Sequence, residues 1–106
     1  MITVTFTEKG ENLSLRLEGH AGYAEHGKDI VCASASILAY TLASIIESLG
    51  DDVESVIDMT GGNATIECKC NGTRTYVKAI NAYHFTRMGY ALLAHNYPQY
   101  VRLIES

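Results

Sequence analysis

The segment ITVTFTEKGENLSLRLE, residues 2–18, contains the pattern that decides the fold class. Apolar side chains occupy every second position of 2–7 and again of 13–18: Ile2, Val4, Phe6, Leu13, Leu15 and Leu17. A period of two residues is that of a β-strand with one buried face. Lys9-Gly10-Glu11-Asn12 between the two runs supplies turn residues, so the segment is predicted to form a β-hairpin.

An uncharged run follows at residues 30–46, IVCASASILAYTLASII. Asp29 is suited to cap the first turn of a helix and Gly50 to end it, so we expect a helix over 30–49. A membrane span has to be considered for such a run, but it is short for a bilayer and contains several hydroxyl groups. We therefore expect a helix of a folded domain, buried on most of its circumference.

The second half of the chain predicts another hairpin, another helix and a last strand. Strands are expected at 53–59 and 64–70, around the turn Thr60-Gly61-Gly62-Asn63, and a final strand at 100–104. A long helix is expected between Gly72 and Pro98, with a packed or hydrogen-bonded stripe formed by Val77, Ile80, His84, Met88, Ala91 and His95. The order ββαββαβ indicates an α+β fold in which two helices pack on a mainly antiparallel sheet.

Composition limits the class of protein. A chain of 106 residues with 47% hydrophobic and 19% charged residues is expected to form a single folded domain over 1–106. Its net charge of −4 argues against nucleic acid as a direct partner. Three irregularly spaced cysteines and a start without a signal-peptide pattern favour a reducing, cytoplasmic location.

The segment between residues 19 and 32 places a histidine and a cysteine on either side of a glycine-containing loop. His20 follows the second predicted strand, and Cys32 lies in the first turn of the predicted helix, where unpaired N–H groups favour a thiolate and could hold an oxyanion. A cysteine and a histidine together can carry out nucleophilic acyl transfer. The alternative is structural, because a free cysteine is commonly a small buried core residue.

Cys68 and Cys70 are two positions apart on a predicted strand, so their side chains share one face. We expect them to pack in the core with Ala64 and Ile66. A zinc site would need two further ligands, and no nearby segment has the spacing for them. No metal and no cofactor are therefore expected.

Nine positions between residues 19 and 36 resemble the signature of the ribosomal-processing cysteine protease family called Prp. They are Gly19, His20, Ala21, Asp29, Ile30, Val31, Cys32, Ala33 and Ser36. The likeness continues more loosely over the whole domain, including M-I-T-V at 1–4 and Y-V-R-L at 100–103.

This resemblance implies a cysteine endopeptidase, usually dimeric, that removes the N-terminal extension of a large-subunit ribosomal protein. It assigns Cys32 as nucleophile and His20 as general base, with Gly19, Asp29 and Ser36 as supporting or substrate-binding positions. Asp29 could orient His20 or, as we favour, cap the helix.

The loop over 21–28 is expected to be mobile until substrate binds, with Tyr23 packing on the substrate peptide. Two other functions remain open: a non-catalytic ribosome-assembly or peptide-binding module, and a redox-sensing thiol protein. No membrane partner is expected.

Overall fold

The computed structural model describes residues 1–25, 27–60 and 63–105. Its elements are β1 (Ile2–Lys9), β2 (Asn12–Glu18), α1 (Ile30–Ser48), a 3₁₀ turn η1 (Gly50–Asp52), β3 (Val53–Asp58), β4 (Ala64–Cys70), α2 (Thr73–Asn96) and β5 (Val101–Glu105). This order confirms the predicted α+β fold. The predicted ends differ from these by a few residues, and Gly61 and Gly62 of the predicted turn lie outside the described residues.

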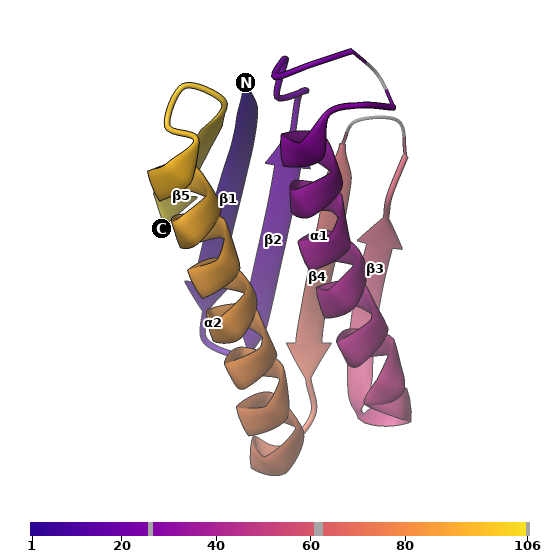
Figure 1. The fold of residues 1–106 in the computed structure, drawn as a ribbon. Helices are drawn as coiled ribbons and strands as arrows, with labels where there is room; N and C mark the ends of the chain where they lie inside the picture. Colours follow the sequence, from indigo (N-terminus) through magenta and orange to yellow (C-terminus); the bar gives the residue numbers. More distant parts are fainter. Residues whose placement is uncertain (26, 61–62, 106) are drawn as a thin grey trace.

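The strands form one sheet in the order β3-β4-β2-β1-β5. Neighbouring strands are antiparallel except β1 and β5, which pair in parallel. Both helices lie side by side on the same face of this sheet (Figure 1). The molecule is therefore a two-layer domain, with its core between the helices and one face of the sheet.

The alternation of the sequence explains which face of the sheet is buried. Val4, Leu15 and Ile66 are fully buried toward the helices, and the β2–β4 register places Leu15 opposite Ile66. The intervening threonines of β1 lie on the other, partly open face. Full burial of each such aliphatic side chain contributes about 2 kcal/mol relative to exposure. Burial of these central strands therefore fixes the place where β2 ends and β4 begins.

Helix α1 buries one side rather than most of its circumference, so the expectation of extensive burial was wrong. Its buried residues are Val31, Ala35, Ala39, Leu42, Ala43 and Ile46. Ile37 is 62% exposed, because a helix on a two-layer domain has no second layer above it. By length and composition alone α1 could cross a membrane, a test that the core helix of a soluble protein also passes.

The predicted stripe of α2 was also wrong, because the buried side is rotated from it. The buried residues are Ala79, Ala82, Tyr83, Thr86, Tyr90 and Leu93, whereas Val77, His84, Met88 and His95 are exposed. Tyrosines enter the core because their hydroxyls find acceptors there: Tyr83 Oη donates to the Ile66 carbonyl at 2.9 Å and Tyr90 Oη to the Ala35 carbonyl at 2.7 Å. Nε2 of His84 instead lies 3.7 Å from Oε2 of Glu8 at the surface.

Candidate active site

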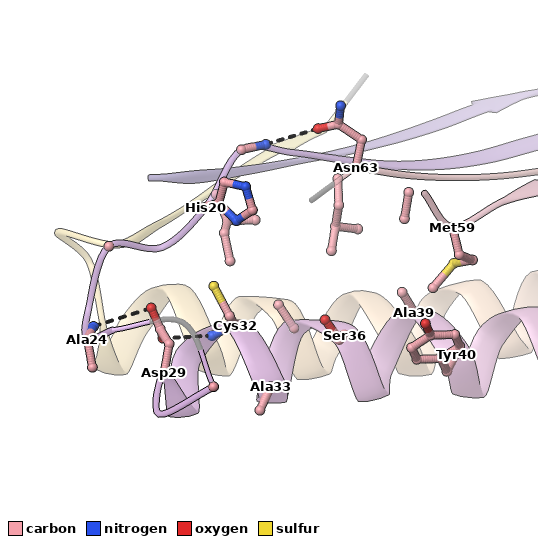
Figure 2. Close-up of a pocket in the computed structure, with 17 residues that line it drawn as sticks. His20, Ala24, Asp29, Cys32, Ala33, Ser36, Ala39, Tyr40, Met59 and Asn63 are labelled. Atoms are coloured by element: carbon pink, nitrogen blue, oxygen red, sulfur yellow. Dashed lines mark hydrogen bonds between the residues drawn. The ribbon is translucent and has the colours of Figure 1, made fainter. Parts of the chain in front are cut away.

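A cavity of about 650 Å³ opens where β2 ends, β4 begins and α1 starts. Its lining includes His20, Asp29, Cys32, Ser36, Tyr40, Met59 and Asn63. Figure 2 shows α1 on one side of this cavity and the strand ends carrying His20 and Asn63 on the other. The two sequence-predicted catalytic residues therefore share one cavity.

His20 lies just beyond β2, and the backbone before it is held in an unusual conformation. Gly19 has a φ of +92°, a region that side chains disfavour. A Cβ atom there would lie 2.5 Å from the carbonyl oxygen of Met1. The Gly19 N–H donates to Oδ1 of Asn63 at 3.2 Å. Glycine at this position thus permits the close approach of Met1 to the backbone that leads to His20.

Cys32 lies in the first turn of α1 and is half-buried. Its Sγ points from the helix toward the side of the cavity on which His20 lies (Figure 2). The backbone N–H of Ala21 donates to this sulfur at 3.4 Å. A donor aimed at the sulfur favours negative charge there, so the residue after His20 is part of the electrostatic environment of Cys32.

Asp29 organises both the helix start and the loop before it. Oδ1 accepts the N–H groups of Val31 at 3.0 Å and Cys32 at 2.9 Å, and Oδ2 accepts those of Tyr23 at 3.0 Å and Ala24 at 3.3 Å. Burial alone would raise the pKa of this carboxyl, but the N–H groups of Cys32, Ala24 and Tyr23 outweigh it and hold the pKa below its ordinary value.

The capping role expected for Asp29 is confirmed. Among the hydrogen bonds of the described residues, none joins its carboxylate to the ring of His20. The expectation that the first-turn N–H groups could hold an oxyanion was wrong for Val31 and Cys32, because Asp29 already occupies both donors. The Ala21 N–H donates to the sulfur itself.

Ser36 and Tyr23 differ in their relation to the cavity. Ser36 lies one helical turn after Cys32 and lines the cavity. The ring of Tyr23 packs edge-on against Tyr97, at 5.6 Å between centroids, and against Tyr100, at 5.2 Å, and it does not line the cavity. His26 of the same loop lies outside the described residues.

Cys68 and Cys70 are buried in the core of the sheet, as predicted. Burial raises the pKa of the Cys68 thiol to about 11, and burial likewise raises the pKa of Cys70. No group of three or more His, Cys, Asp or Glu side chains suited to a metal comes together within 1–25, 27–60 and 63–105.

These environments predict the order in which the cysteines react. We expect iodoacetamide to label Cys32 at least about tenfold faster than Cys68 or Cys70, because alkylation needs both access and thiolate. Peptide mapping by mass spectrometry after short exposures to the native protein measures the three rates. Equal labelling of Cys32 and Cys68 would contradict the difference that the structure indicates.

The sequence did not identify three residues that line the cavity: Tyr40, Met59 and Asn63. Tyr40 belongs to the uncharged run of α1, residues 30–46. Met59 and Asn63 belong to the connection between β3 and β4. Only the pairing of β4 with β2 brings that turn beside His20. The turn residues Thr60 to Asn63 in the sequence were the available signal, but they carried no information about which strand would lie next to β4.

The cavity therefore contains a thiol at a helix start and a histidine on its opposite side, the two groups that a cysteine protease needs. The family model described as "Cysteine protease Prp" matches residues 1–102. The chain belongs to this family of cysteine proteases.

Known proteins are similar along most of the chain. The "Ribosomal processing cysteine protease Prp" of Staphylococcus aureus strain Mu50 is 29% identical over 83 residues, which cover 76% of this chain and 69% of that protein. The S. aureus Prp structure in complex with a covalently linked product peptide superposes with a TM-score of 0.83 at 26% identity, over 100% of both chains. SMU.848 from Streptococcus mutans gives 0.68 at 30% identity, over 100% of this chain and 96% of that one.

Proposed function

We propose that this protease removes the N-terminal extension of a large-subunit ribosomal protein, with Cys32 and His20 as its catalytic dyad. The observation that carries the proposal is the cavity in which Cys32 Sγ points toward His20 and accepts the Ala21 N–H at 3.4 Å. In this proposal Cys32 supplies the nucleophile, His20 the base and the Ala21 N–H a donor for negative charge, all in one cavity.

The chemistry follows the usual balance of acyl transfer. His20 takes the thiol proton of Cys32, and the sulfur forms a bond to the carbonyl carbon of the scissile peptide. The protonated His20 then gives that proton to the leaving amine as the C–N bond breaks. Water, deprotonated by His20, hydrolyses the resulting thioester and regenerates the thiol, so no cofactor or metal enters the reaction.

The supporting residues act on this dyad in different ways. Asp29 fixes the first turn of α1 and the loop, and so determines where Cys32 points. Gly19 permits the close backbone approach before His20. Ser36 presents a hydroxyl to the cavity one turn further along α1, where it can bond to the backbone of a bound peptide.

The S. aureus relatives are named ribosomal processing proteases, and one was crystallised with a product peptide. This likeness supports a ribosomal protein as the substrate and the bacterial cytoplasm as the location. A basic ribosomal protein also suits an enzyme whose net charge is −4. Neither nucleic acid nor a membrane is needed by the proposal.

The test is direct cleavage. The purified enzyme is incubated with a bacterial large-subunit ribosomal protein that carries an N-terminal extension, and the products are weighed by mass spectrometry. We expect one cut within the extension and none in the same protein lacking it. Tight binding without any cut would instead support the non-catalytic peptide-binding alternative.

The loop remains a proposed element of specificity. Tyr23 leans on Tyr97 and Tyr100 and is held through its N–H by Asp29. Its ring therefore has to leave this cluster, or the peptide has to reach the exposed part of the ring, for the two to pack together. Movement of Tyr23 out of this cluster when substrate binds is the form of induced fit that we propose for this enzyme.

We also propose a homodimer that forms through the outer helix face, meaning Ile37, Phe85, Met88 and Leu92. These side chains are exposed on the helix layer, and Phe85 is 77% exposed. They flank the contact between Leu38 and Gly89 that joins the two helices. Residues 30–46, which include Ile37, carry no charge, so the α1 part of this face brings no like charges together when two copies meet across a twofold axis.

Phe85→Asp tests this surface. We expect the wild-type protein to sediment as a dimer and Phe85→Asp as a monomer, because two buried carboxylates would face each other across the axis. Val56→Asp is the matched control, since Val56 is exposed on the edge strand β3. A monomeric wild type, or a dimeric Phe85→Asp, would rule out this interface.

A further inference from the structure

We propose that Asn63 is a positioning residue of the active site. Its side-chain carbonyl fixes the segment 19–21, which presents both His20 and the Ala21 N–H to Cys32. This inference rests on the proposed Cys32/His20 dyad. Asn63 belongs to a different hairpin from the dyad and lies outside the Gly19–Ser36 segment.

The bond between Asn63 and Gly19 continues the pairing of β2 with β4. Backbone pairing between β2 and β4 reaches Leu17 and Ala64; β4 begins at Ala64, and β2 ends one residue later, at Glu18. Beyond that pair, Oδ1 of Asn63 accepts the N–H of Gly19 at 3.2 Å. A side chain therefore supplies one more rung where the backbone ladder has stopped. The residue after Gly19 is His20.

The opposite side of the same segment is held by Met1, the residue before β1. The main-chain nitrogen of Met1 donates to the carbonyl oxygen of His20 at 2.6 Å, and the Met1 carbonyl lies against Gly19. The Gly19–His20 segment is thus held by the main chain of Met1 on one side and by the Asn63 side chain on the other. Loss of the Asn63 bond frees one of the two sides.

The last residue of this segment contacts the proposed nucleophile: the Ala21 N–H donates to Cys32 Sγ at 3.4 Å. A shift of Gly19 therefore moves the imidazole and this donor together relative to the nucleophile. Misplacement of catalytic groups by a fraction of an ångström to an ångström is enough to slow catalysis strongly. Substrate affinity depends on the rest of the cavity and is less affected.

Asn63 does not use its side chain to close its own turn. Its backbone N–H already donates to the Thr60 carbonyl at 3.2 Å, which closes the connection between β3 and β4. The side chain of Thr60 forms a separate bond to Asp58 within that connection. Thr60→Ala is therefore a matched control that perturbs the same turn without touching Gly19.

The experiment compares Asn63→Leu, which keeps the size but loses the acceptor, with Asn63→Asp, which keeps an acceptor oxygen. Each variant, Thr60→Ala and the wild type are assayed for kcat and KM with an extension-bearing substrate, and for Tm. A second readout is the alkylation rate of Cys32 as a function of pH, which needs no substrate.

We expect Asn63→Leu to lower kcat about tenfold or more with KM within about twofold and to change the pH profile of Cys32 alkylation. Asn63→Asp should retain kcat within about threefold, and Thr60→Ala should match the wild type. Full activity of Asn63→Leu, equal losses in the Leu and Asp variants, or a loss that follows Tm would overturn the proposal. Cleavage that persists in Cys32→Ala would instead refute the dyad itself, so the two failures are distinguishable.

Discussion

Cys32→Ala and His20→Ala are each expected to reduce cleavage by at least about a thousandfold while leaving the fold intact. The reason is that nucleophile and base act as one unit, so removing either leaves no route to the thioester. The double variant should be no slower than the slower of the two single variants. Initial rates with an extension-bearing substrate, together with circular dichroism of each variant, measure this.

Two control substitutions distinguish loss of the dyad from the general effect of removing a cysteine or a histidine. Cys68→Ala removes a buried thiol on β4, and His95→Ala removes an exposed histidine near the end of α2. Both variants should cleave at rates within about twofold of the wild type. A Cys32→Ala or His20→Ala protein with near-normal turnover would show that the dyad is wrongly assigned.

Asp29→Ala is expected to give the largest loss of stability among the site variants, about 2–3 kcal/mol in the free energy of unfolding. One buried carboxylate satisfies four backbone N–H groups, and alanine leaves all four without this acceptor. Cleavage should fall as well, because the first turn carrying Cys32 loses its cap. Urea unfolding at neutral pH measures the effect. Glu25→Ala, an exposed carboxylate of the same loop, is the control.

The stability difference should depend on pH in a defined direction. The pKa of Asp29 is lowered from its ordinary 3.8 in the folded protein, so its contribution is fully present above 3.8. That contribution is lost as the pH falls through the lowered folded-state pKa. The difference in the free energy of unfolding between the wild type and Asp29→Ala should therefore narrow below pH 3.8, because a protonated carboxyl is a weaker acceptor, and a constant difference down to strongly acidic pH would contradict this account.

The sequence predicted the elements of the fold better than the burial of the helices. Alternation in β1 and β2 is unambiguous, because every second residue is apolar. In α2, Tyr83 and Tyr90 are buried through hydroxyl bonds to main-chain carbonyls, while Met88 lies outside. Periodicity counts a methionine as core and a tyrosine as ambiguous, so the predicted stripe was rotated away from the true one.

Local sequence was enough to predict the residues of the candidate site that lie close together in the chain. Gly19, His20, Asp29 and Cys32 all lie within one stretch, and the cap at Asp29 follows from its place before the helix. Asn63 could not be predicted, because its contact with Gly19 depends on β4 pairing with β2 rather than with another strand. Strand order is a property of the whole sheet, and short alternating segments do not encode it.

The parallel pair of β1 and β5 has a consequence for how the domain reaches its final form. Ile2 pairs with Val101, so this part of the sheet joins segments from nearly opposite ends of the sequence. The two hairpins can form from local contacts, whereas β5 docks only after a loop of almost the entire domain has closed, which is entropically costly and slow. During synthesis, the edge of β1 that pairs with β5 therefore stays unpaired until β5 has been made. In the finished molecule, this five-residue edge strand is the element from which we expect opening to begin.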